Sequence, residues 1–115
     1  MILIMKIEIL LPTEYIASDL HLAKLSKNLL DKVESELVNL ILNFEGGITK
    51  TRVEGYYKSN KGIVTKSKYI SLVVYTDNVE WFKSLISKGV FNSYCKRLKQ
   101  ESIGVVIDNR FLCLS

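Results

Sequence analysis

The residues best suited to phosphate chemistry stand in the stretch GGITKT, where Gly46 and Gly47 precede Thr49, Lys50 and Thr51. A Walker-type loop places its glycines between a strand and the start of a helix, so that backbone N–H groups and the helix dipole face the phosphates. Here the order is reversed, because the glycines follow a long helical pattern and precede a β-rich run. The stretch therefore predicts a left-handed helix cap followed by a strand, not a nucleotide site.

Groups for acid–base, nucleophilic or metal chemistry are scarce. His21 is the only histidine, and its place before a helical pattern favours a surface or capping role over a general base. Cys95 and Cys113 lack metal-ligand spacing, so we expect two free, buried thiols in a reducing cytosol. Glu54 has no acidic partner and is expected to pair with Lys50, Arg52 or a lysine of the facing strand. The sequence thus predicts no catalytic residue, no metal site and no cofactor, although a site shared between two chains would leave no linear motif.

The positive charge is concentrated in one segment. The chain carries a net charge of +4, and residues 50–68 contain six basic residues against Glu54 alone, so this segment is at +5 and the remainder at −1. The candidate basic patch comprises Lys50, Arg52, Lys58, Lys61, Lys66 and Lys68. Such a patch fits a nucleic-acid contact, for which binding has to weaken steeply with salt.

The N-terminal half predicts a strand and a long helix. Residues 2–11 alternate as a strand does, with Leu3, Met5, Ile7, Ile9 and Leu11 on one face, and Pro12 ends the run. Residues 13–19 are expected to form a loop. Apolar residues then recur every three to four positions, as on one stripe of a helix: Leu22, Leu25, Leu29, Val33, Leu37, Leu40, Ile41 and Phe44. Asp19 and Ser26 are both suitable N-caps, and the sequence does not choose between them.

The second half predicts two hairpins around another helix. Residues 48–57 and 63–76 are rich in β-branched and aromatic residues, with Asn60, Lys61 and Gly62 as the turn between them. A helix capped by Asp77 or Asn78 carries Val79, Phe82, Leu85, Ile86, Val90, Tyr94 and Leu98, with Gly89 as a kink or break. The stretches SIGVVID and RFLCLS flank the dipeptide DN as a short final hairpin.

This element order predicts an α+β, ferredoxin-like βαββαβ sandwich with an antiparallel sheet, two helices on one face and a short extra C-terminal strand. A length of 115 residues fits a single domain over 1–115. Lys6 and Glu8 interrupt the apolar N-terminus too early for a signal peptide or a membrane span, so a cytoplasmic protein without membrane contact is expected.

The sheet face away from the helices is the place to look for function. If Ile70, Leu72 and Val74 point to the helices, the alternation turns a candidate oligomer face outward: Tyr69, Ser71, Val73, Tyr75, Lys6 and Leu10. Aromatic anchors favour self-association as a dimer or trimer. The alternative is stacking on nucleic-acid bases, but KYISLVVY lacks the glycine and the first two aromatics of the RNA-recognition signature.

Short motifs add a resemblance. Gly46, Gly47, Thr49, Gly55, Tyr56, Gly62, Gln100, Glu101 and Ser102 carry it. Over residues 3–107 the chain resembles small uncharacterised bacterial proteins with G-G-x-T and Gln-Glu-Ser motifs, and in element order it looks broadly like the PII/CutA-type proteins. The resemblance implies a ferredoxin-like fold and an oligomer, commonly a trimer. An ATP sensor of the PII kind is not expected, because the hairpin turns in about four residues.

We therefore expect a small, cytosolic, self-associating binding or regulatory protein with an unknown small-molecule ligand; the alternative is a nucleic-acid-binding module that uses the basic 50–68 hairpin. Gly55, Tyr56, Gln100 and Glu101 form a candidate cleft between subunits. The alternative is a purely structural role, in which Gly55 forms a strand bulge and Gln100 lies at a helix terminus.

Overall fold

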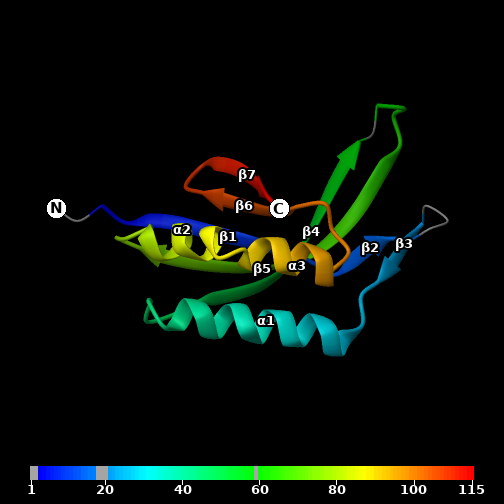
Figure 1. The fold of residues 1–115 in the computed structure, drawn as a ribbon. Helices are drawn as coiled ribbons and strands as arrows, with labels where there is room; N and C mark the ends of the chain where they lie inside the picture. The colour runs from blue at the N-terminus through cyan, green and yellow to red at the C-terminus, as the bar shows by residue number, and fades with distance from the viewer. Residues whose placement is uncertain (1–2, 18–20, 59) are drawn as a thin grey trace.

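The computed structural model describes residues 3–17, 21–58 and 60–115, which form an α+β fold with one five-stranded antiparallel sheet, a small hairpin and three helices. The elements are β1 (Met5–Pro12), β2 (Glu14–Ile16), β3 (Leu22–Lys24), α1 (Lys27–Leu42), β4 (Thr49–Lys58), β5 (Val64–Thr76), α2 (Glu80–Ser87), α3 (Val90–Arg97), β6 (Ile103–Ile107) and β7 (Arg110–Leu114). The large sheet has the strand order β4-β5-β1-β6-β7, and β2 pairs with β3 (Figure 1).

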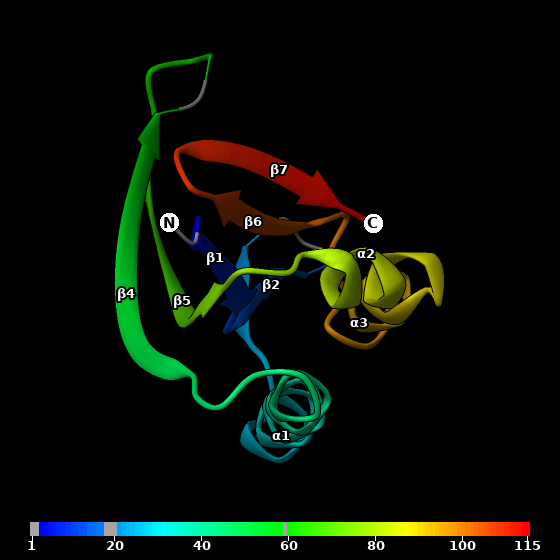
Figure 2. The ribbon, with the colours of Figure 1, turned by 90° about the vertical axis from the view of Figure 1, so that its left-hand side faces the viewer.

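All three helices lie on one side of the large sheet (Figure 2). The core between them consists of β-branched and aliphatic strand residues, such as Ile9 and Leu72, packed on apolar helix residues, such as Leu37 and Phe82. Each of these four side chains is buried, and removing the larger part of one typically costs about 2–5 kcal/mol. The sheet therefore has one face that belongs to the core and one that does not.

The β4–β5 hairpin is longer than the strands beside it. β1 pairs with β5 only from Tyr69 to Thr76, whereas β4 and β5 stay paired outward to Lys58 and Val64. Beyond β1 the two strands continue alone, and their tip projects from the body in both views (Figures 1 and 2). We call the segment from Val53 to Lys68 the arm. A two-stranded ribbon without a covering layer is marginally stable, so the arm is poorly supported by its own chain.

Two sequence predictions in the N-terminal half are wrong. Residues 13–19 are not simply a loop, since Glu14–Ile16 forms β2 and pairs with β3. The helical stripe begins too early, because Leu22 lies in β3 and α1 begins only at Lys27, with the Ser26 side chain accepting a hydrogen bond from Leu29 N (3.1 Å). The other candidate cap, Asp19, lies outside the described residues.

The ends of the elements also differ from expectation. The first strand begins at Met5, and Leu3 is exposed. The predicted glycine cap after α1 is absent: α1 ends at Leu42 with Asn43 in a right-handed conformation, and Gly46 and Gly47 do not have a positive φ. Phe44 therefore leaves the helical stripe and stacks on Trp81, with ring centroids 6.0 Å apart.

Gly89 does break the second helical region, since its φ of 76° separates α2 from α3. The turns are placed as predicted: Gly62 has a φ of 81°, and Asp108 and Asn109 link β6 to β7. The chain leaves α3 through a Schellman motif, in which Lys99 takes the left-handed position and Gln100 N donates to Cys95 O at 2.8 Å. Gln100 thus sits at a helix terminus.

Candidate functional site

The strand register places the candidate oligomer face on the side of the sheet away from the helices. Ile7 pairs with Val74 and Ile9 with Leu72, and all four side chains are buried toward the helices. The alternating residues of β1 and β5 therefore point the other way. This open face carries Lys6, Glu8, Leu10 and Pro12 from β1; Tyr69, Ser71, Val73 and Tyr75 from β5; Gly104 and Val106 from β6; and Phe111 and Cys113 from β7.

The open face holds exposed aromatic rings. Tyr75 is 61% exposed and Phe111 is 62% exposed. Gly104 makes room for the Phe111 ring, because a Cβ atom at that glycine would lie 3.0 Å from two ring carbons. A larger residue there would push the ring aside, so the glycine and the aromatic residue belong to one surface.

Charge is distributed very unequally between the two sides of the sheet. In the described strands, Lys6 and Glu8 are the only charged side chains on the open face. The residues of β4 and β5 that face the helix side include Lys50, Arg52, Glu54, Lys58, Lys66 and Lys68. Depletion of charge together with aromatic residues is the signature of the buried centre of a protein interface.

The two charges on the open face are of opposite sign and lie two residues apart on the central strand. Glu8 accepts a hydrogen bond of 2.5 Å from the hydroxyl of Ser71, which is 1% exposed. Lys6 donates its backbone N–H to the side chain of Asp108 at 2.9 Å and leaves its ammonium group exposed. Adjacent opposite charges suit a two-fold contact, in which each residue meets the other residue of the second copy.

Five members of the candidate basic patch lie on the opposite, helix side of the arm and the adjoining strands, and the sixth, Lys61, lies in the turn of the hairpin. Two members of the patch are neutralised: Lys50 forms an ion pair with Glu34 of α1 (2.8 Å), and Lys66 pairs with Glu54 across the hairpin (3.1 Å). The expectation that Glu54 pairs with a lysine of the facing strand is thus confirmed. Among the described residues, Arg52 and Lys68 form no ion pair.

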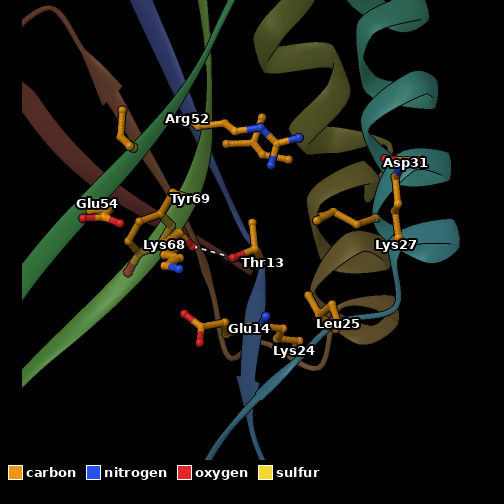
Figure 3. Close-up of a pocket in the computed structure, with 13 residues that line it drawn as sticks. Thr13, Glu14, Lys24, Leu25, Lys27, Asp31, Arg52, Glu54, Lys68 and Tyr69 are labelled. Carbon is orange, nitrogen blue, oxygen red and sulfur yellow. Dashed lines mark hydrogen bonds between the residues drawn. The ribbon is translucent and has the colours of Figure 1, made fainter.

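A groove lies where the base of the arm meets the start of α1 (Figure 3). It has a volume of about 550 Å³, within the range of roughly 300–1,000 Å³ that small-molecule pockets occupy. Its lining comes from five segments and comprises Thr13, Glu14, Lys24, Leu25, Lys27, Leu30, Asp31, Arg52, Val53, Glu54, Lys68, Tyr69 and Ile70. Arg52 reaches from β4 toward α1, which carries Lys27 and Asp31 on the other wall (Figure 3).

Thr13 forms hydrogen bonds to two other segments that line the groove. Its backbone N–H and its hydroxyl group both donate to Lys68 O, at 3.2 and 3.0 Å, and its carbonyl accepts from Leu25 N at 2.9 Å. Next to it, the side chain of Gln100 donates to Glu14 O at 2.7 Å. These bonds connect β5, the segment before α1 and the end of α3, so the shape of the groove is set before any ligand arrives.

Sequence reasoning found the strand residues of the groove but not its other walls. Arg52 and Lys68 belonged to the basic patch, whereas Thr13 and Glu14 stood in a segment expected to be a loop and Lys24 in the predicted helix. No short motif marks them, because they meet only through the β2–β3 hairpin and the start of α1.

The candidate cleft is not assembled within one chain. Gly55 and Tyr56 are adjacent residues of β4 and therefore point to opposite faces, and Tyr56 is 68% exposed on the helix side. The register runs without interruption through the pair of Gly55 and Ser67, so Gly55 is not a bulge. Gln100 is tied to Glu14, and Glu101 is exposed.

The remaining chemical groups do not converge. Cys95 is buried, which raises the pKa of its thiol, but Cys113 is exposed on the open face, so the prediction of two buried cysteines is wrong. His21 is exposed just before β3. Among the described residues there is no group of three His, Cys, Asp or Glu side chains arranged to hold a metal, and no helix long and apolar enough to cross a membrane.

An ion pair links α1 to α3 and lines a second pocket between these two helices. Arg97 donates to the Glu36 carboxylate from both terminal guanidinium nitrogens, at 2.5 and 3.2 Å, which lowers the pKa of Glu36 and raises that of Arg97. Burial raises the pKa of the adjacent Tyr94 to about 12, so this phenol stays protonated. The ion pair therefore joins α1 to α3 on the helix side of the protein.

Comparison with known proteins extends the fold but not the chemistry. No protein-family profile and no curated protein sequence matches the chain. The solved structure of a phage SAM lyase in complex with S-methyl-5′-thioadenosine is similar in fold, with a TM-score of 0.59 and 11% sequence identity over 97% of this chain and 89% of that chain. At this identity the similarity shows a shared α+β fold alone.

Proposed function

We propose that the chain is a small, self-associating binding protein of ferredoxin-like architecture. The order β1, α1, β4, β5, α2 and α3, β6 supports that architecture, with the β2–β3 hairpin and β7 as additions. The resemblance to PII/CutA-type oligomers and a cytoplasmic location remain predictions that agree with it.

The observation that carries self-association is the separation of charge across the sheet. A second copy would cover Tyr75 and Phe111 and would bring Lys6 against Glu8 of the other chain. It would also cover the uncharged side of the arm, which its own chain leaves without a packing layer. Together these features favour the open face over the basic side as the surface of association.

Native mass spectrometry tests this proposal. The unmodified chain is expected to give one discrete oligomer, and the double variant Tyr75→Asp, Phe111→Asp a monomer, because four buried carboxylates per dimer would have no partners. The matched control is Tyr56→Asp, which changes a similarly exposed aromatic residue on the helix side and is expected to leave the oligomer intact. A monomeric unmodified chain, or an oligomer that survives the double change, overturns the placement.

The first ligand to test is taken from the structurally similar phage enzyme. S-methyl-5′-thioadenosine and S-adenosylmethionine, added separately at millimolar concentration, are the probes. If the protein retains either compound in the same spectra, this supports a role in binding S-methyl-5′-thioadenosine or S-adenosylmethionine. If it retains neither, the two compounds are excluded as ligands, and self-association is still judged by the subunit count.

Nucleic-acid binding is the second candidate, favoured by the clustering of cations on one side of the arm. Tyr56 stands among them and offers a ring for base stacking. The variant with Lys58, Lys61, Lys66 and Lys68 all changed to Glu is expected to lose binding to a labelled single strand at low salt. Unchanged binding would exclude the arm as the contact.

A further inference from the structure

We propose that the groove between Arg52 and α1 binds a small zwitterion: an α-amino-acid head group carried on an apolar body. The inference deepens the binding role proposed above but does not depend on self-association, because the groove is formed within one chain.

The charges of the lining select the ligand class. Four cations and three carboxylates face the groove, and one carboxylate, Glu54, is already paired with Lys66 at 3.1 Å. The groove then keeps four cations and two carboxylates, Glu14 and Asp31, so a polyphosphate would have like charges as well as opposite charges beside it. A ligand with one anionic and one cationic group meets complementary partners on both walls.

Arg52 is the residue suited to the carboxylate of such a ligand. A guanidinium group presents a planar fork of donors that matches a carboxylate with two parallel hydrogen bonds. Arg52 forms no ion pair among the described residues, and it points across the groove rather than out along the arm (Figure 3). Arg52 lies at the base of the arm, where it pairs with Ile70 of β5.

Asp31 is placed to receive the ammonium group. It projects from α1 on the wall facing Arg52 (Figure 3), and no ion pair within the described residues occupies it. Between the two walls lie three apolar side chains, Leu25, Leu30 and Ile70, all of them buried. The volume of the groove exceeds what a head group alone requires, so the apolar floor takes the body of the ligand.

Matched fluorescent probes test each part of the inference. ε-Dansyl-L-lysine carries the complete α-amino-acid head group, N-dansyl-6-aminohexanoate carries only a carboxylate, and dansylcadaverine carries only an ammonium group. Binding is measured by fluorescence anisotropy against the unmodified protein, Arg52→Gln, Asp31→Asn and the control Arg110→Gln, which removes an exposed arginine on β7 outside the groove.

The zwitterion is expected to bind at least tenfold more tightly than either partial probe. Arg52→Gln should weaken the zwitterion and the carboxylate probe at least tenfold but not the ammonium probe, and Asp31→Asn should show the reverse selectivity. Equal binding of the three probes, no binding of the zwitterion, an equal effect of Arg110→Gln, or stronger displacement by tripolyphosphate than by a free amino acid would each overturn the inference. Subunit count, measured in parallel, reports self-association separately.

Discussion

Replacing Phe111 by Ala measures what the open face contributes to association. An aromatic side chain buries about 150–250 Å² in full, and because 62% of Phe111 is exposed, roughly 100–150 Å² remains for a second copy to cover. At about 25 cal/mol per Å² this is worth about 3 kcal/mol for each ring. A two-fold interface contains two such rings, worth about 6 kcal/mol together, so the dissociation constant is expected to rise by roughly ten-thousandfold.

Sedimentation equilibrium over a range of protein concentrations is the assay. Tyr56→Ala serves as the matched control, because that ring is 68% exposed but lies on the other side of the sheet. Phe111 packs over Gly104 rather than in the core, so circular dichroism of the variant should be unchanged. A rise of less than tenfold for Phe111→Ala, or an equal rise for Tyr56→Ala, would refute the reasoning from charge separation and exposed rings.

Further predictions concern stability and reactivity. Thr76→Val removes the buried hydroxyl group that hydrogen-bonds to Glu45 and to the backbone after β5. It should lower the free energy of unfolding by about 2–3 kcal/mol, measured in urea titrations followed by tryptophan fluorescence. A loss below about 0.5 kcal/mol would contradict this hydrogen-bond network. The guanidinium partner of Glu36 on α3 lowers the pKa of this carboxyl, so its contribution to stability is complete above the ordinary carboxyl pKa and is lost as pH falls through the lowered value. Glu36→Gln should therefore flatten the acid limb of stability against pH, and an unchanged limb would count against the ion pair. Cys113 should react rapidly with Ellman's reagent in dilute protein and more slowly once chains associate, whereas Cys95, buried and with a raised thiol pKa, should react only when the fold opens; equal rates would contradict both placements.

The face assignment could be made from the sequence because alternation is a local property. Once Ile70, Leu72 and Val74 are taken as core residues, the pleat of a strand sends Tyr69 and Tyr75 to the other side. The same rule places the lysines of the hairpin on a single side. The pairing of β5 with β1 and β4 then showed that the charged side of β4 and β5 is the side that faces the helices.

Helix ends were less accessible to sequence reasoning. Gly46 and Gly47 are the usual residues for a left-handed cap, yet neither takes that conformation, whereas Lys99 does so after α3 although it is not a glycine. Leu22 fits the helical stripe by its spacing, but it lies in β3, which pairs with β2. At such positions tertiary contacts compete with the local conformational preference of the residue, and the two contributions are similar in free energy.

The chain by itself determined the α+β class, the position of the basic hairpin and the alternation that turns Tyr69 and Tyr75 away from the core, because each depends on residue types at fixed local spacing. The tertiary structure alone decided the groove. Thr13, Asp31, Arg52 and Lys68 come from separate segments and meet only when Thr13 bonds to β5 and to the start of α1. A site built from such long-range hydrogen bonds leaves no periodic pattern in the sequence, since the spacing of its residues is set by how the elements pack and not by the geometry of any one of them.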